Sequence, residues 1–342
     1  MSALLNTLYV TTEGAQLYKD HETLVVKVEG TKKLQVPLLH LSSVVCMGPI
    51  YVSPDLMSAC SQSGIHISFF SVTGRFQSRV EGIPGGNVLL RRQQHRAADD
   101  VARSLRLARA MVLGKLSGGR QFLLHARRDA AEERKESLEF AANRLAIHIA
   151  ELARAETMDT LRGLEGIAAK DYFSVFDLLI KRTEPALRFG GRSRRPPRDP
   201  VNALLSFGYA LLSQDCAGAL AGVGLDPAVG YLHEERPGRL SLALDMMEEL
   251  RCPVVDRLVL ALLNRGQLDP SDFVSDDGGG WKLQDDARKR FLVAYQEAKQ
   301  VDVLHPLLEQ RIPWGRVPHV QAQLLARTLR GDLDDYPPFV FR

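Results

Sequence analysis

The chain has 342 residues, of which 45% are hydrophobic and 25% charged, and this is the balance of a globular protein of about two domains. Its net charge of +3 hides a local excess, because the stretch from Arg75 to Arg128 carries 12 lysines and arginines against 3 acidic residues. Such an excess favours an anionic polymer as the binding partner.

The cysteines and the N-terminus exclude several classes of protein. The four cysteines lie far apart without a CxxC pair, which argues against a zinc site and a secreted disulfide framework. Residues 1–7 lack the basic and apolar parts of a signal peptide, and no run of about 18 apolar residues predicts a membrane span. We therefore expect a cytoplasmic protein with reduced thiols and no membrane partner.

Residues 1–86 are predicted to form a small β domain. Short runs of β-branched and apolar residues predict the strands Thr23–Glu29, Lys33–Pro37, Val44–Met47 and Ile65–Phe70. Residues 29–32 predict a hairpin turn between the first two strands. Ser53 and Pro54 are typical of the N-cap and first position of a short helix.

After residues 83–87, where a proline and two glycines predict a linker, the hydrophobic pattern changes to the period of a helix. Residues 87–342 are therefore predicted to form a larger all-α domain, and the fold class is α+β with two domains. The expected helices are Leu89–Leu116, Asn143–Glu156, Gly163–Ile180, Val201–Leu212, Ala228–His233, Leu242–Asn264 and Asp285–Lys299. Asp199–Pro200 and Asp226–Pro227 each have the residue types of a helix start, and the tail from Arg330 is expected to be irregular.

Four polar residues in the helical half are candidate catalytic residues: Glu165, His233, Asp245 and Glu248. Oxygen ligands with one imidazole suit Mg²⁺ or Mn²⁺. Asp245 and Glu248 are three residues apart, so they share one face of a helix, and one ion could bridge them. The alternatives are a solvated acidic face that includes Glu249, a structural histidine, and a first-turn carboxylate at Glu165.

Long stretches around these residues resemble a known family. They are Glu165–Phe173, Arg195–Tyr209, Gly224–His233 and Arg236–Arg251. Through them the chain resembles the CRISPR-associated adaptation endonuclease/integrase family, the catalytic protein of spacer acquisition, over nearly its whole length. The resemblance implies Glu165, His233 and Glu248 as metal ligands, with Asp245 as an acidic helper.

The resemblance also implies an activity and partners. It implies a manganese- or magnesium-dependent DNA nuclease and integrase, in which the 3′-hydroxyl of a short DNA fragment attacks a phosphodiester of the CRISPR repeat. It implies a homodimer formed through the β domain, and a small ferredoxin-like adaptation partner. Two rival functions stay open: a metal-dependent nuclease that does not integrate, and a DNA-binding scaffold without activity.

Arginines predict the DNA path. Arg103 and Arg106 lie three residues apart on one side of a predicted helix, although a solvated face is an equal alternative. The segment from Gly190 to Arg198 is predicted to be a flexible loop that binds DNA phosphates through Arg192, Arg194, Arg195 and Arg198.

Overall fold

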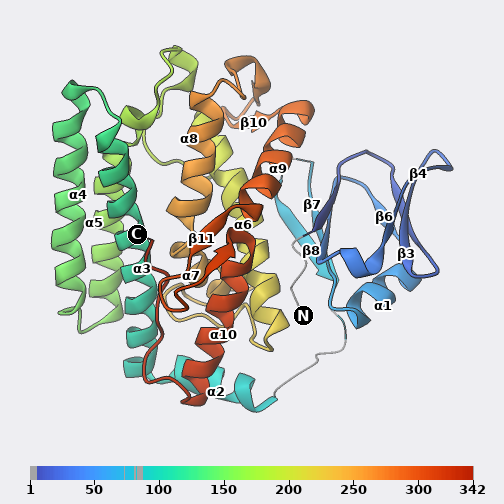
Figure 1. The fold of residues 1–342 in the computed structure, drawn as a ribbon, viewed down its shortest axis with the longest axis horizontal. Helices are drawn as coiled ribbons and strands as arrows, with labels where there is room; N and C mark the ends of the chain where they lie inside the picture. Colours follow the sequence, from blue (N-terminus) through green and yellow to red (C-terminus); the bar gives the residue numbers. More distant parts are fainter. Residues whose placement is uncertain (1–5, 73, 81, 83–87, 342) are drawn as a thin grey trace. The chain divides into compact units, whose positions relative to one another are not determined.

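The computed structural model describes residues 6–72, 74–80, 82 and 88–341 (Figure 1). The chain divides into two compact units: residues 1–86 with Leu292–Gln300, and residues 87–291 with 301–342. The expected order of a strand-rich N-terminal region and a helical C-terminal region is confirmed. The predicted linker at residues 83–87 lies outside the described residues.

The first unit contains two four-stranded sheets, with the strand orders β1-β5-β7-β8 and β4-β3-β2-β6. The strands are β1 Thr7–Val10, β2 Gln16–Asp20, β3 Thr23–Val28, β4 Thr31–Pro37, β5 Ser43–Met47, β6 Tyr51–Val52, β7 His66–Phe70 and β8 Phe76–Val80. Apolar side chains of both sheets, including Leu17, Leu24, Val44 and Ile67, form one buried core with Leu56.

The local predictions for this unit are confirmed. The hairpin of β3 and β4 is antiparallel, and its turn places Glu29 and Gly30 at positive φ values of 50° and 74°. Helix α1 (Pro54–Gln62) begins after Ser53, whose hydroxyl accepts a hydrogen bond from the Leu56 amide at 3.3 Å. Strands β1, β2, β6 and β8 were not predicted. β1 and β6 have residues that favour strands but are only four and two residues long, and β2 and β8 include polar residues with a weaker strand preference.

The second unit is mainly helical. Its helices are α2 Val88–Asp99, α3 Val101–Arg128, α4 Glu132–Leu152, α5 Met158–Ser174, α6 Pro200–Gly222, α7 Ser241–Glu248, α8 Arg257–Asn264, α9 Asp285–Gln300 (its last nine residues in the first unit) and α10 Val317–Arg330. The short turns are η1 Leu38–His40 in the first unit, and η2 Phe176–Leu179, η3 Pro185–Leu187, η5 Pro270–Asp272 and η6 Trp314–Arg316 in the second. Helices α3, α4 and α5 pack side by side (Figure 1).

Two short antiparallel strand pairs also belong to this unit, so the prediction of an all-α domain is wrong in this detail. They are β9 (Phe273–Ser275) with β10 (Trp281–Leu283), and β11 (Asp302–Leu304) with β12 (Arg311–Pro313). Strands of three residues are too short to show a period in the sequence.

Helix starts were predicted better than helix continuity. Asp199 caps α6 by accepting the Asn202 amide at 2.7 Å, as expected. The single helix predicted for residues 89–116 is two helices, because the Asp100 carboxylate accepts the amides of the first turn of α3. The helix predicted for residues 242–264 is interrupted by η4 (Arg251–Asp256), a π-helical segment in which Pro253 removes one amide donor. Helix α10 was not predicted.

Two further expectations concern the whole chain. Within the described residues, Cys46, Cys60, Cys216 and Cys252 are all buried and free of disulfides. None of the helices that the structure describes is both long and apolar enough to cross a membrane.

Candidate metal centre

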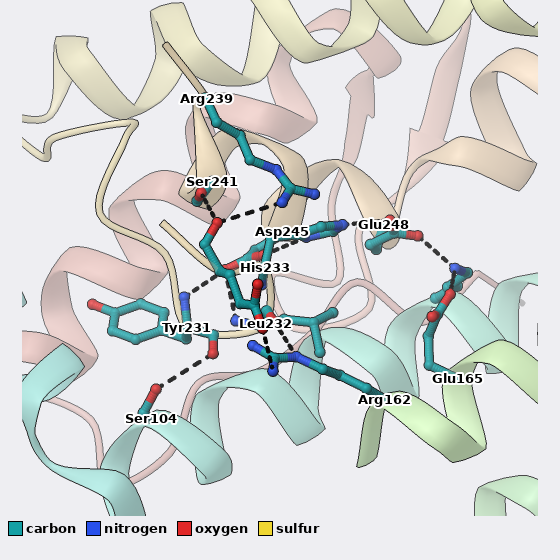
Figure 2. Close-up of polar contacts among 12 residues, drawn as sticks. Ser104, Arg162, Glu165, Tyr231, Leu232, His233, Arg239, Ser241, Asp245 and Glu248 are labelled. Carbon is teal, nitrogen blue, oxygen red and sulfur yellow. Dashed lines mark hydrogen bonds and ion pairs between the residues drawn. The ribbon is translucent and has the colours of Figure 1, made fainter. Parts of the chain in front are cut away.

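The loop that carries His233 is held by a carboxylate from α7. Asp245 is fully buried, and its Oδ2 accepts hydrogen bonds from the amides of Tyr231 and Leu232 at 2.6 and 3.0 Å. Its Oδ1 accepts the His233 amide at 2.9 Å (Figure 2). The helix predicted for residues 228–233 is therefore wrong, because these amides bond to a side chain instead of to carbonyls four residues earlier.

Glycine at position 230 allows this close approach of the loop to α7. A Cβ atom on Gly230 would lie 2.8 Å from Asp245 Oδ2 and 2.8 Å from the carbonyl carbon of Ser241. Two other side chains hold the loop carbonyls: Ser104 donates to Tyr231 O at 3.4 Å, and Arg162 donates to Leu232 O at 2.9 Å (Figure 2). The loop is thus fixed from α3, α5 and α7.

Asp245 also orients the imidazole ring of His233. The distance between His233 Nδ1 and Asp245 Oδ1 is 2.7 Å, so Nδ1 carries the hydrogen when the carboxylate accepts it. In this tautomer His233 Nε2 carries the lone pair, and it lies 3.8 Å from Glu248 Oε1. Since both oxygens of Asp245 are already occupied by donors, the structure does not support an ion shared between Asp245 and Glu248. Asp245 has the position of a residue that orients a histidine ligand.

The three ligands expected from the sequence lie around one place in the second unit. Helix α5 supplies Glu165, α7 supplies Glu248, and the loop supplies His233. A fourth residue, Lys115 of α3, stands between the two glutamates: its Nζ contacts Glu165 Oε1 and lies 2.8 Å from Glu248 Oε2. Sequence reasoning missed Lys115, whose only signal is a lone cation in an otherwise apolar part of a helix.

Burial decides between the alternatives for the acidic cluster. Asp245, Glu248 and Glu249 are 0%, 3% and 0% exposed, so the solvated acidic face is wrong. Burial raises the pKa of Glu248, but the positive charges of Arg251 and Lys115, with a smaller contribution from His233, outweigh it and lower this pKa. Glu248 is therefore a buried carboxylate that remains charged.

Glu249 points away from the centre and binds the C-terminal tail. Its carboxylate accepts hydrogen bonds from the Tyr336 hydroxyl at 2.7 Å, the Phe339 amide at 2.6 Å and Gln321 Nε2 at 2.9 Å. Burial raises the pKa of Glu249 to about 7, against the opposite effect of these donors. The tail is irregular, as expected, but it is packed, since Tyr336 and Phe339 are buried.

Two further residues that were not predicted from the sequence, Arg251 and Asp256, line the same cavity as Glu248. Arg251 forms an ion pair with Glu248, with Nη2 2.9 Å from Oε1, and its guanidinium lies 4.8 Å from the Tyr209 ring centre. Asp256 accepts hydrogen bonds from the hydroxyls of Tyr172 and Tyr209 at 2.9 and 2.6 Å, and burial raises its pKa to about 6. Both tyrosines are therefore core residues. A cavity of about 40 Å³ lies among these side chains, and Lys115 and Arg194 also line it.

The chemistry of the donor set fits a hard divalent cation. Among the described residues, no group of three or more His, Cys, Asp or Glu is arranged around an ion position, since Lys115 stands between Glu165 and Glu248. Yet Glu248 Oε2 is a buried oxygen of a charged carboxylate, and its partner among the described residues is itself a cation, the Lys115 ammonium at 2.8 Å. Two carboxylates and a free imidazole nitrogen are ligands of the kind that Mg²⁺ or Mn²⁺ accepts.

The predicted DNA-binding arginines differ in availability. The loop from Gly190 to Arg198 is anchored rather than flexible, because buried Asn202 binds Gly191 O at 2.7 Å and the Ser193 amide at 2.9 Å. Arg192 is held by Asn202 and Ser206, and burial lowers its pKa to about 10. The side chains that remain exposed are Arg106, Arg194, Arg195 and Arg198, while Arg103 is half-buried.

The centre thus combines buried carboxylates and an imidazole with lysine and arginine side chains. The sequence matches the family model for CRISPR associated protein Cas1 over residues 8–297. The CRISPR-associated endonuclease Cas1 2 of Rhodospirillum rubrum is 52% identical, and Cas1 1 of Moorella thermoacetica is 46% identical, each over the whole length of both chains. A CAS1 protein from Thermotoga maritima has the same fold, with a TM-score of 0.81 at 24% identity over 95% of this chain and 97% of that one.

The chain belongs to the Cas1 family. The family resemblance and the CRISPR-associated endonuclease class expected from the sequence are both confirmed.

Proposed function

We propose that this Cas1 chain is a divalent-metal-dependent DNA endonuclease and integrase that joins short DNA fragments to a CRISPR repeat. Glu165, His233 and Glu248 would hold Mg²⁺ or Mn²⁺. The observation that supports the proposal is a set of close contacts. Lys115 Nζ contacts Glu165 Oε1 and Glu248 Oε2, and Glu248 Oε1 lies 3.8 Å from His233 Nε2, so side chains from two helices and a loop are neighbours.

Each protein group has a definite part in this proposal. A bound ion supplies Lewis-acid assistance and lowers the pKa of an attacking hydroxyl. Asp245 keeps His233 in the tautomer whose Nε2 can bind a cation. Arg251 holds Glu248 in place through the 2.9 Å contact, and Arg194 adds positive charge at the cavity for a phosphate group.

Strand transfer is the reaction we favour over hydrolysis, although water and a 3′-hydroxyl would use the same centre. A casposase bound to an integration product shares the fold with a TM-score of 0.83 at 19% identity, over 98% of this chain and 94% of that one. This likeness is one of fold, and it makes integration the first reaction to test.

We also propose partners and a division of labour between the units. DNA would bind the exposed side chains of Arg106, Arg194, Arg195 and Arg198, and half-buried Arg103. Arg192 is left out, because Asn202 and Ser206 hold its guanidinium. Residues 1–86 would form the homodimer contact, and residues 87–342 would form the catalytic part. A small ferredoxin-like adaptation protein would complete the assembly; a Cas6-RT-Cas1–Cas2 complex includes a chain of this fold, with a TM-score of 0.83 at 23% identity, over 100% of this chain and 36% of that one.

The test combines the protein and its small adaptation partner with a DNA fragment bearing 3′-hydroxyls, a supercoiled repeat plasmid and Mn²⁺. We expect joined product from the wild type and from Glu136→Ala, a control at an exposed glutamate of α4. Glu165→Ala, His233→Ala and Glu248→Ala should each abolish joining.

The possible outcomes separate the rival functions. Joining by all three variants would contradict the ligand assignment. Cleaved plasmid without joined product from the wild type would favour a nuclease that does not integrate. Tight DNA binding without cleavage, joining or any response to Mn²⁺ would favour a scaffold.

A further inference from the structure

Lys115 occupies the place between two of the proposed ligands. It lies on α3, while Glu165 and Glu248 lie on α5 and α7, so three helices meet at its ammonium group. Its Nζ is 2.8 Å from Glu248 Oε2 and also contacts Glu165 Oε1. A cation bound by both carboxylates would have to lie in this same region.

In the metal-free protein, charge balance explains why a cation lies between Glu165 and Glu248. Glu248 is 3% exposed and Glu165 has 26% of its side chain exposed, so two neighbouring carboxylates are shielded from water. A buried charge without a partner is strongly unfavourable. Lys115 and Arg251 together supply two positive charges to the two carboxylates.

A divalent ion would upset this balance, because it adds two charges close to two existing cations. Like charges a few ångströms apart in a poorly solvated site repel strongly. One of the two cations must therefore move, or the ion binds weakly.

Lys115 is the cation that can move. Arg251 is fixed by Glu248 and by the Tyr209 ring at 4.8 Å, with only 11% of its side chain exposed. The side chain of Lys115 is 17% exposed and borders the cavity, and a lysine is a point charge on a flexible four-carbon stem. Departure of the ammonium would leave Glu248 Oε2, which lies 2.8 Å from it, open to another cation.

We propose that Lys115 is a built-in counter-cation that holds the place between Glu165 and Glu248 in the metal-free protein and is displaced when a divalent ion binds. This inference rests on the proposed metal-dependent function. Lys115 would then compete with the metal: its ammonium group lowers the affinity for the ion and stabilises the metal-free fold.

The experiment measures Mn²⁺ binding without DNA, by electron paramagnetic resonance of the free ion, and thermal unfolding with EDTA or with Mn²⁺. Lys115→Met keeps an unbranched, flexible side chain that is one atom shorter, and it removes the charge. It should bind Mn²⁺ at least about tenfold more tightly than the wild type. Its midpoint of unfolding in EDTA should fall by about 5 °C, because two carboxylates lose their shared cation.

A charge-matched control and an opposite variant complete the test. Lys170→Met removes an exposed positive charge from α5 and should behave as the wild type in both measurements. Lys115→Arg keeps the charge on a bulkier, planar group that leaves less readily, so it should retain the unfolding midpoint in EDTA and bind Mn²⁺ more weakly. This second variant decides the question if Lys115→Met does not fold.

The results for the inference and for the proposed function are distinguishable. If the wild type binds Mn²⁺ and Glu165→Ala loses this binding, the metal site stands. With the site established, wild-type affinity in Lys115→Met or in Lys115→Arg would overturn the displacement of Lys115 alone. If the wild type binds no Mn²⁺, both the proposed metal site and the proposed displacement of Lys115 are refuted.

Discussion

Replacing Asp245 by asparagine tests whether one carboxylate organises the whole centre. The substitution preserves size but changes an acceptor-only group into one acceptor and one donor. In the wild type, Oδ2 accepts two amides, and Oδ1 accepts the His233 amide and faces His233 Nδ1. Whichever way the new amide is turned, its NH₂ group faces at least one main-chain donor that has lost its acceptor.

The magnitude follows from the number and burial of these bonds. Hydrogen bonds to a charged group contribute about 1.5–3 kcal/mol each, and at least one, in one orientation two, are lost at a fully buried position. We therefore expect the free energy of unfolding to fall by about 3 kcal/mol, which lowers the midpoint by about 4–6 °C.

The assay is thermal and urea unfolding of Asp245→Asn beside Asp129→Asn, a control at an exposed aspartate after α3. Mn²⁺ affinity and DNA joining are measured on the same samples, and both should fall because the His233 ring loses its orientation. An Asp245→Asn protein with wild-type stability and wild-type joining would refute the reasoning.

Three further predictions concern the surroundings of the centre. Gly230→Ala places a Cβ 2.8 Å from Asp245 Oδ2, so it should lower the free energy of unfolding by about 2 kcal/mol, and an unchanged midpoint in thermal unfolding would contradict the close approach. Deletion of residues 336–342 removes two of the three donors to Glu249 together with buried Phe339. Urea unfolding of the truncated chain should show that the free energy of unfolding falls by at least about 3 kcal/mol. A truncated chain as stable as the wild type would contradict the packing of the tail. Burial raises the pKa of Asp256 from 3.8 to about 6. Between these two pH values the carboxyl group is protonated in the native state and ionised in the unfolded state, so the native state loses stability as the pH rises. The difference in unfolding free energy between Asp256→Asn and the wild type should therefore rise in favour of the variant by about 2 kcal/mol from pH 4 to pH 6, out of about 3 kcal/mol in all, and level off above about pH 7. A difference that is the same at all pH values would contradict this.

Capping residues show how far local sequence carries the fold. Ser53 and Asp199 each begin a helix as predicted, because the side chain of each binds an amide only three residues along the chain. Asp226–Pro227 has the same residue types, and the Asp226 carboxylate does bind the Ala228 amide at 2.8 Å. No helix follows, because Gln94 and Asp245, remote in sequence, bind the main chain of this loop.

The candidate site likewise has features that the local sequence predicts and features that depend on contacts between remote residues. Glu165, His233 and Glu248 could be named from the sequence, since they lie in long family-like stretches. The role of Asp245 could not, because a spacing of three residues on a helix suggested a shared ion, whereas the folded loop uses both of its oxygens.

The sequence by itself determined the order of a strand-rich and a helical region, several helix starts, the family and the three candidate ligands, since these depend on neighbouring residues or on long ordered stretches. Only the tertiary structure decided which charges are paired. Lys115 meets Glu165 across 50 positions of the chain, and Arg251 and Lys115 keep Glu248 charged in a buried place. Electrostatic energies depend on distance and solvent exposure in space, and neither is determined by separation along the chain.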